Sequence, residues 1–367
     1  MIAGPVTGLG RRRIFAAALA LAIPLVLALA LGEAAVRLLA PQDLTGAWLT
    51  AGPRGLILNE AGARARHQFG DRVVTYRINR LHQRGGEPAE GVPRVLVLGS
   101  SFTFGWLLEE GDTVPAVLQS LSDSELGVGR VQFLNASTGG WGLASYLAYL
   151  EAFGDAVDPV AVVAFLNANA FPWAVASGLY EARADDLLAL EVRDATPRHA
   201  WLRRELRRLP GVQWLLTHSH LAQLIRTRLA MILVPPTVPV RKYDARDRGP
   251  VDTHPPDAKT RVFAEALLRR MKAWCEARNV QLFLVSLYHY HFSPGVYEWL
   301  APVMTDAAIP FLDLQAPIAA AVGDDIGGYF FAVDPHPNER TNALVARLAW
   351  RWLKPRLESK LETPVKK

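Results

Sequence analysis

The sequence is poor in cysteine, in net charge and in repeated segments. Cys275 is the only cysteine among 367 residues, so no disulfide can form within the chain. The formal net charge is only +5, and the basic residues are not interleaved with aromatic side chains, which argues against a nucleic-acid partner. Apolar residues, in contrast, make up 50% of the chain. A chain of this length can therefore bury a sizeable core.

The longest apolar run lies near the N-terminus, over residues 14–31, and only Pro24 interrupts it. Its length is close to the minimum that crosses a bilayer as a helix. Three arginines, residues 11–13, precede it, and positive charge on one flank keeps that flank in the cytoplasm. We therefore expect a cytoplasmic tail over 1–13, a single transmembrane anchor over 14–32, and the rest of the chain on the other side of the membrane.

Two alternatives to an anchor remain for this run. The stretch "ALALGEAA" has small residues at the spacing of a signal-peptide cleavage site, and a buried core helix would also be apolar. The length of the run and the apolar residues of "AAVRLL" that continue it favour an uncleaved anchor. Arg13 and Glu33 also bracket the run, as expected for a membrane span.

From residue 94 onward, short apolar runs alternate with helical patterns. Five runs are typical of buried strands, namely "RVLVLG", "VQFLN", "PVAVVAFLN", "VQLFLVSL" and "IPFLDL". Strands that are apolar on both faces and alternate with helices indicate a parallel sheet covered by helices on both sides. We therefore predict an α/β domain over residues 93–355 with a flavodoxin-like, doubly wound, five-stranded parallel sheet. In such folds ligands bind at the carboxyl ends of the strands.

The regions around this pattern are less regular. Residues 33–92 are rich in Gly, Pro and Arg and predict a connecting segment, with one short strand over 72–79 where residues alternate. Residues 174–255 contain a basic amphipathic stretch followed by a proline-rich loop, which predicts a largely helical insertion. Residues 356–367 form a polar tail.

Two motifs carry the residue types of nucleophilic catalysis. In "GSSFTFG", Ser100 and Ser101 directly follow the first predicted strand. A serine there lies near the N–H groups that begin the next helix, which suits a nucleophile. In "DPHPN", Asp334 precedes His336 by two residues. Histidine is the usual base for a serine, and an aspartate can orient it. Each motif alone is also compatible with ordinary turn chemistry.

Two further segments offer hydrogen-bond donors for an oxyanion. "FLNASTGGWG", residues 133–142, follows the second strand, and its small residues allow backbone N–H groups to face a pocket. "FLNANAF" follows the third strand and contains Asn167 and Asn169, either of which can donate an amide N–H. Turn chemistry is again the alternative for both segments.

In this order, the four motifs resemble the sequence blocks of the SGNH/GDSL hydrolase superfamily. "VLVLGSSFTFG" is similar to the nucleophile block Gly-Asp-Ser-Phe-Thr-Phe-Gly, and this match implies that Ser101 is the nucleophile. The last block implies His336 as its base and Asp334 as the partner of the histidine. The middle blocks imply an oxyanion hole formed by the N–H groups of Ser101 and Ser137 with the Asn169 amide.

The chain departs from the family pattern at several positions. Ser100 stands where the family has Asp, Ser137 where it has Gly, and Ala170 where it has Asp. "INRLHQRGG" resembles the Asn-x-x-Gly-x-Arg segment that precedes the first block in membrane-anchored bacterial members, with His82 in place of Gly. The resemblance covers most of residues 72–350.

The resemblance implies a serine esterase that removes a small acyl group, most plausibly acetyl, from an envelope or exported carbohydrate. The chain would be a single-pass bacterial inner-membrane protein with its catalytic domain in the periplasm or outside the cell. Two alternatives are an O-acyltransferase acting on polysaccharide hydroxyls and a non-catalytic scaffold in polysaccharide assembly. We expect no metal or organic cofactor. The candidate substrate-binding residues are Asn167, Trp141, Trp173 and His289.

Overall fold

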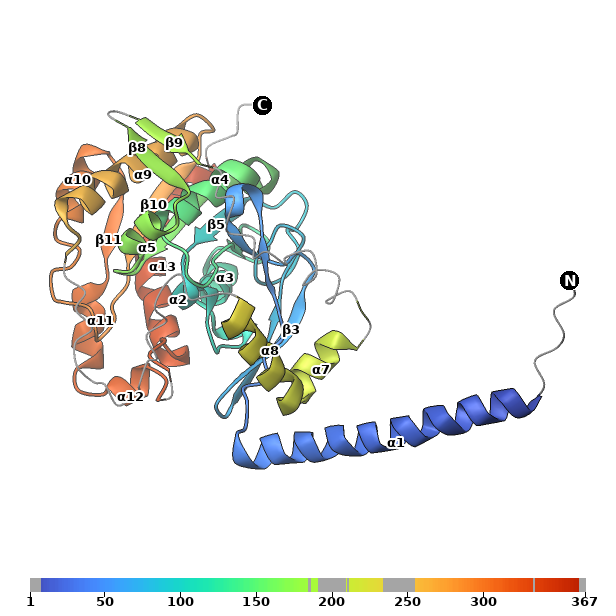
Figure 1. Cartoon of the computed structure of the whole chain (residues 1–367). Coiled ribbons are helices and arrows are strands. Elements are labelled where there is room, and N and C mark those ends of the chain that lie inside the picture. Colours follow the sequence, from blue (N-terminus) through green and yellow to red (C-terminus); the bar gives the residue numbers. More distant parts are fainter. Residues whose placement is uncertain are drawn as a thin grey trace, which may run out of the picture. The chain divides into compact units, whose positions relative to one another are not determined.

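The computed structural model describes residues 8–183, 186–190, 209, 211–233, 255–332 and 334–362 (Figure 1). The chain divides into two compact units. One contains Met1–Gly46 and Leu202–Val240, and the other contains Ala47–Trp201 and Arg241–Lys367.

The larger unit is built on a five-stranded parallel sheet. The order of its strands is β11 (Phe311–Asp313), β10 (Gln281–Ser286), β7 (Pro159–Leu166), β5 (Arg94–Leu98), β6 (Gln132–Asn135). All five predicted strands are present, and this is the flavodoxin-like order. The predicted fold class is therefore confirmed. Because β6 and β7 lie on opposite sides of β5, the topological switch point is at the carboxyl end of β5.

Side chains alternate between the two faces of the sheet, as the geometry of a strand requires. On β5, Leu96 and Leu98 enter one buried cluster, while Val95 and Val97 enter the other. All four are fully buried. The apolar composition of the strand follows from this, because both of its faces lie inside the protein.

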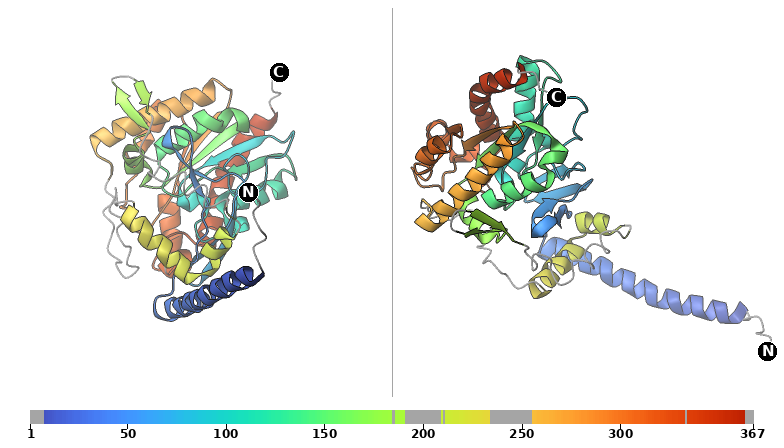
Figure 2. Two further views of the ribbon diagram at one scale, coloured as in Figure 1. Left: turned by 45° about the vertical axis from the view of Figure 1, so that its right-hand side comes forward. Right: turned by 90° about the horizontal axis from the view of Figure 1, so that it is seen from above.

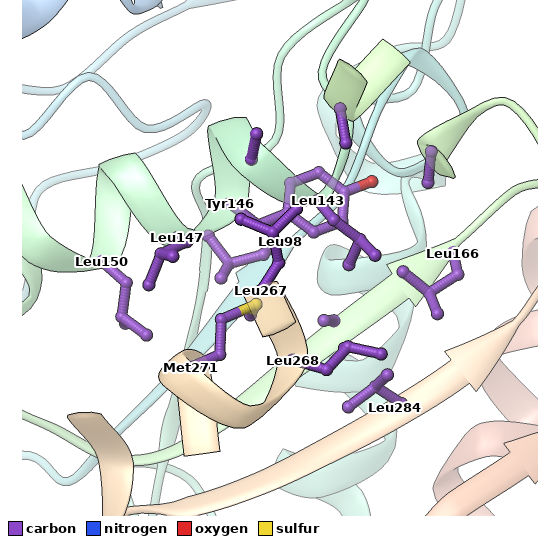
Figure 3. Close-up of a cluster of buried hydrophobic side chains, with 14 of the residues drawn as sticks. Leu98, Leu143, Tyr146, Leu147, Leu150, Leu166, Leu267, Leu268, Met271 and Leu284 are labelled. Carbon is purple, nitrogen blue, oxygen red and sulfur yellow. The ribbon is translucent and has the colours of Figure 1, made fainter. Parts of the chain in front are cut away.

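Helices cover both faces of the sheet (Figure 2). Four of them contribute most of the covering side chains, namely α4 (Leu143–Val157) and α9 (Ala258–Glu276) on one face and α3 (Val114–Glu125) and α13 (Glu339–Glu362) on the other. Figure 3 shows the first face, where Leu98, Leu166 and Leu284 of the strands form one cluster with Leu147 of α4 and Met271 of α9.

Within the described ranges, three antiparallel strand pairs lie outside the sheet. They are β1 (Leu49–Ala51) with β2 (Ile57–Asn59), β3 (Arg64–Phe69) with β4 (Arg72–Arg77), and β8 (Tyr180–Arg183) with β9 (Asp186–Ala189). The strand expected over 72–79 corresponds to β4. Sequence reading missed its partner β3, "RARHQF", because four of its six residues are polar. The region expected to connect the anchor to the domain therefore contains two strand pairs.

The remaining helices of this unit are short. They are η1 (Pro53–Gly55), α2 (Ser101–Phe104), η2 (Glu110–Asp112), α5 (Ala170–Ala176), α10 (Leu300–Asp306), α11 (Gln315–Val322) and α12 (Ile326–Tyr329). Of these, α2 and α5 begin immediately beyond β5 and β7, at the edge of the sheet where the candidate site lies.

The smaller unit contains α1 (Gly8–Leu39), α7 (Val212–His218) and α8 (His220–Leu233). The segment Phe15–Leu39 of α1 is long and apolar enough to cross a membrane, and its apolar window is not buried against any described residue. The helix continues past the predicted span of 14–32 and contains Pro24. Helices α7 and α8 fall within the predicted helical insertion, most of whose remaining residues lie outside the described ranges.

Candidate active site

The turn that carries Ser100 and Ser101 links β5 directly to α2. Strand β5 ends at Leu98, and α2 begins at Ser101. A Cβ atom at Gly99 would collide with the side chain of Thr103 in α2, so the close approach of strand and helix requires glycine there. At the other end of α2, Gly105 has φ +84°, a left-handed conformation that favours glycine. The pattern Gly-Ser-Ser-Phe-Thr-Phe-Gly thus specifies one helical turn with glycine at each side.

Arg84 holds the far end of this turn. Its Nη1 atom donates to the carbonyl oxygens of Phe104 (2.7 Å) and Gly105 (2.6 Å), and Nη2 donates to that of Leu108 (2.5 Å). The Arg84 side chain is 4% exposed and lies over the rings of Tyr76 and Phe104. Burial lowers the pKa of Arg84 to about 10. This arginine is the one that the family-like segment "INRLHQRGG" contributes, and the structure shows that it satisfies the carbonyl groups that end α2.

Ser101, His336 and Asp334 form one hydrogen-bonded chain. His336 Nε2 lies 2.8 Å from Ser101 Oγ, and His336 Nδ1 contacts Asp334 Oδ1. The backbone N–H of His336 also donates to Asp334 Oδ1 at 2.9 Å. With Nδ1–H directed at the carboxylate, Nε2 is left as the acceptor for the Ser101 hydroxyl. This is the geometry in which a histidine removes the proton of an attacking serine.

Ser100 does not face the histidine. Its hydroxyl accepts a hydrogen bond from Asn167 Nδ2 at 2.7 Å, and both side chains are buried. The two adjacent serines therefore point to different partners. Asn167, one of the candidate substrate-binding residues, uses its amide within the protein interior.

The environment of Asp334, next to His336, favours its ionised form. Burial alone would raise the pKa of Asp334, but the hydrogen bonds and charge of His336 outweigh it and hold the pKa of this carboxyl below its usual value. The carboxylate can therefore stabilise the imidazolium that forms when His336 takes a proton. The rings of Phe102 and Trp106 lie beside His336, at centroid distances of 5.3 and 5.8 Å.

His289 supports the loop that carries Asp334 and His336. The backbone N–H of His291 donates to His289 Nδ1 at 3.1 Å, which places the ring proton on Nε2. Nε2 in turn donates to the carbonyl oxygen of Pro335 at 2.5 Å, between Asp334 and His336. Burial lowers the pKa of His289 to about 3, so the ring is neutral.

Two of the side chains expected to bind substrate are hydrogen-bonded inside the protein. Both ring nitrogens of His289 are used inside the protein, and its side chain is buried. Trp141 is 2% exposed and donates through Nε1 to the carbonyl oxygen of Ile57 at 2.6 Å. It therefore joins the loop after β6 to β2 and cannot stack on a sugar. Trp173 on α5 is partly exposed and remains a candidate.

The backbone N–H of Ser137, which was expected to bind the oxyanion, also has a hydrogen-bond partner within the protein. Its backbone N–H donates to Asn135 Oδ1 at 3.2 Å. The next residues form a turn closed by the N–H of Trp141 and the carbonyl oxygen of Thr138 (3.3 Å). The amides of the two central turn residues are not used within such a turn. Those residues are Gly139 and Gly140, and their N–H groups have no hydrogen-bond partner among the described residues.

The turn at Gly139 approaches Ser101. A methyl group at Gly139 would lie 4.0 Å from Cβ of Ser101. Within the expected segment, residues 133–142, the Ser137 N–H is used inside the loop, whereas Gly139 is the residue that approaches Ser101. The paired glycines were the available signal, since two adjacent glycines allow a backbone to approach a side chain closely.

Asn169 begins α5 and is partly exposed, and its side chain makes no capping hydrogen bond. The Ser101 N–H is the first of α2 and has no partner within that helix, as at any helix start. Both groups are therefore available as donors at the edge of the sheet. In the described part of the chain, no group of three or more His, Cys, Asp or Glu residues is placed to hold a metal ion.

Comparison with known proteins finds no matching family model and no matching curated protein. Several solved structures are similar. TesA has a TM-score of 0.41 and 16% identity, covering 71% of this chain and 98% of its own. The esterase EstA from Pseudoalteromonas sp. has a TM-score of 0.39 and 12% identity, covering 72% and 98%. Axe2, an acetyl-xylooligosaccharide esterase from Geobacillus, has a TM-score of 0.39 and 11% identity, covering 76% and 98%. These similarities are distant, and the function proposed below rests on the geometry of the site.

Proposed function

We propose that this chain is a serine hydrolase of the SGNH type that removes a small acyl group such as acetyl from an envelope or exported carbohydrate. The observation that carries the proposal is the hydrogen-bonded chain of Ser101, His336 and Asp334, with 2.8 Å between Ser101 Oγ and His336 Nε2. It lies at the carboxyl end of β5, the switch point where ligands bind in such folds.

The proposed reaction has two steps. Ser101 Oγ attacks the ester carbonyl carbon while His336 Nε2 takes the hydroxyl proton. The tetrahedral intermediate then collapses, and His336 returns the proton to the leaving alcohol, which leaves an acyl-enzyme. Water attacks the acyl carbonyl carbon with His336 again as the base. The bond to Ser101 Oγ then breaks, His336 returns the proton to this oxygen, and the carboxylic acid is released. Asp334 stabilises the imidazolium in both steps.

The proposed oxyanion hole combines three donors. They are the N–H of Ser101, a glycine N–H of the turn at Gly139 and Gly140, and the Asn169 side-chain amide. Each is available at the edge of the sheet, and a fixed donor of this kind lowers the barrier by about 3–4 kcal/mol. A methyl group at Gly139 would lie only 4.0 Å from Cβ of Ser101, and this narrow space beside the serine supports a small acyl group. The partly exposed Trp173 supports a sugar as the alcohol portion.

The proposal includes membrane anchoring by α1, with the N-terminus in the cytoplasm and the catalytic unit in the periplasm or outside the cell. Its support is the apolar segment Phe15–Leu39 and the three arginines that precede it. To test the orientation, a cysteine replacing the exposed Val262 can be labelled with a membrane-impermeant thiol reagent in intact cells whose outer membrane has been permeabilised. Labelling only after the inner membrane is lysed would contradict the orientation.

The assignment of the nucleophile can be tested with the full-length protein in detergent. A fluorophosphonate probe should label the wild type and Ser100→Ala but not Ser101→Ala, and hydrolysis of p-nitrophenyl acetate should follow the same order. Labelling lost in Ser100→Ala and retained in Ser101→Ala would contradict the assignment. No labelling of the wild type, together with retained glycan binding, would favour a non-catalytic scaffold. Labelled acetyl groups appearing on an added polysaccharide would show transfer instead of hydrolysis.

A further inference from the structure

Helices α7 and α8 are tied to the C-terminal end of α1. The Glu33 carboxylate accepts hydrogen bonds from Ser219 Oγ (2.7 Å) and from the backbone N–H groups of His220 (3.0 Å) and Leu221 (2.9 Å). A carboxylate in this position satisfies the unpaired N–H groups that begin α8 and complements the helix dipole. Arg37, one turn further along α1, donates to Glu33 Oε1 (2.6 Å) and to the carbonyl oxygen of His218 (2.8 Å).

One face of α8 packs on the segment that follows α1. Gln223 Nε2 donates to the carbonyl oxygen of Asp43 at 2.8 Å, and Arg226 Nη1 donates to that of Thr45 at 3.0 Å. His220 Nδ1 accepts from the backbone N–H of Gln42 at 2.8 Å. These contacts recur every three residues along α8, so they fix one side of the helix toward the polypeptide.

Apolar side chains face outward on the same two helices. Ile225 and Leu229 of α8 are each 49% exposed and lie four residues apart, on one face. On α7, Trp214 is 63% exposed and Leu215 is 45% exposed. The exposed Arg228 lies between the two apolar residues of α8 in the sequence. Four large apolar side chains are thus presented next to the end of a helix whose own apolar surface is exposed.

We propose that α7 and α8 lie in the headgroup region of the bilayer, with Trp214, Leu215, Ile225 and Leu229 inserted toward the acyl chains. This inference rests on the proposed membrane anchoring by α1. If Phe15–Leu39 crosses the bilayer, Glu33 and Arg37 lie within its last two turns and hold α7 and α8 at the depth of the membrane surface. Trp is enriched at that depth, and a cation such as Arg228 attracts anionic headgroups.

Nitroxide scanning of the full-length protein tests this proposal. In a Cys275→Ser background, which removes the only native thiol, single cysteines replace Trp214, Leu229, Leu25 of α1 and Val262 of α9. Each spin-labelled protein is reconstituted in vesicles of phosphatidylethanolamine and phosphatidylglycerol. The ratio of relaxation by oxygen to relaxation by a water-soluble nickel chelate is then measured, because oxygen concentrates in lipid and the chelate in water.

The expected order of this ratio is Leu25 highest, Trp214 and Leu229 intermediate, and Val262 lowest. A high ratio at Leu25 with ratios at Trp214 and Leu229 equal to that of Val262 would overturn the inference while leaving the anchor in place. A low ratio at Leu25 would overturn the anchor and, with it, the inference. Protection of Trp214 and Leu229 from both reagents would overturn the inference in favour of a protein partner.

A variant separates the role of Glu33 from that of the apolar side chains. Glu33→Gln removes the charge that holds the start of α8, so the label at Leu229 should become more mobile and its ratio should move toward that of Val262. The matched control is Glu60→Gln, which alters a carboxylate outside the smaller unit and should leave the Leu229 label unchanged. An unchanged label in Glu33→Gln would contradict the claim that Glu33 sets the depth of α8.

Discussion

Replacing Arg84 by methionine should destabilise the larger unit and disturb the turn that carries Ser100 and Ser101. Methionine keeps most of the apolar stem but removes the donors that reach the carbonyl oxygens of Phe104, Gly105 and Leu108. The Gly105 carbonyl retains a bond from the Leu108 N–H (3.1 Å), and that of Phe104 retains a long contact to Asn135 Nδ2 (3.5 Å). The variant therefore leaves one carbonyl group without a described partner and two weakly paired.

The size of the effect follows from these contacts. A buried acceptor that loses its partner costs about 1–3 kcal/mol, and bonds from a charged donor are at the upper end. Removing the cation recovers part of the desolvation penalty that lowers the pKa of Arg84 to about 10. We expect a net loss of about 3 kcal/mol, which corresponds to a fall in melting temperature of roughly 6–12 °C for a unit of this size.

The assay combines thermal unfolding with the rate of fluorophosphonate labelling at a temperature where every variant is folded. Arg84→Met should lower both the melting temperature and the labelling rate, because the turn that begins at Ser101 loses its fixed end. Arg84→Lys should lower the melting temperature and the labelling rate by less, since an ammonium group can still donate to some of the carbonyl oxygens. The control is Arg77→Met, which removes an exposed ion pair with Glu110 worth about 0–1 kcal/mol. Equal melting temperatures for Arg84→Met and Arg77→Met would refute the reasoning.

Three further predictions concern the same region. Asn169→Ala should lower kcat for p-nitrophenyl acetate about 100–1,000-fold. It should not change the melting temperature, because the Asn169 amide makes no capping hydrogen bond. Asn167→Ala should also lower the melting temperature, because the buried Asn167 amide donates to Ser100. Gly105→Ala should lower the free energy of unfolding by at least about 1–2 kcal/mol, which is the penalty of the left-handed conformation. Gly111→Ala should leave this free energy almost unchanged, because Gly111 has open space around it. Equal unfolding midpoints in urea for the two variants would contradict this prediction. The pKa of His289 in the folded protein is about 3, below its ordinary value of 6.5, so the unfolded chain takes the proton first. Protonation of His289 in the unfolded chain therefore does not lower the free energy of unfolding above pH 6.5. As the pH falls from 6.5 toward 3, it lowers this free energy by about 1.4 kcal/mol per pH unit. His289→Gln should reduce the slope of unfolding free energy against pH by that amount, and an unchanged slope would exclude this role.

The sheet could be predicted because its strands are buried on both faces. A run such as Val95–Leu98 has no polar residue to suggest any other environment, and all four side chains are fully buried. Strands β3 and β8 were not predicted because half or more of their residues are polar and because each belongs to a short antiparallel pair, whose formation depends on turn geometry and on distant contacts. In β3 only two of six side chains are buried.

Sequence reading located the segments of the site better than it located the atoms. The small-residue loop after β6 was identified, but the donation of the Ser137 N–H to Asn135 depends on a side-chain rotamer that sequence does not specify. His289 and Trp141 were expected at the substrate for their chemistry, yet each uses its ring nitrogen to bind a backbone carbonyl. Residue type indicates what a side chain can bind, and only packing decides what it does bind.

The departures from the family pattern can be explained in the same physical terms. His82 stands in place of a glycine and adopts φ +64°, the left-handed conformation that a glycine adopts without strain. Its ring Nδ1 contacts the carbonyl oxygen of Asn59 at 2.7 Å, an interaction that offsets the strain and that glycine could not make.

Ser100 replaces an aspartate at a fully buried position. An ionised carboxylate there would require a strong donor set to offset its desolvation. The serine hydroxyl requires only the amide of Asn167, which donates to it at 2.7 Å. This neutral pair lies apart from the hydrogen bond between Ser101 and His336, so a serine at position 100 is compatible with the proposed roles of Ser101 and His336.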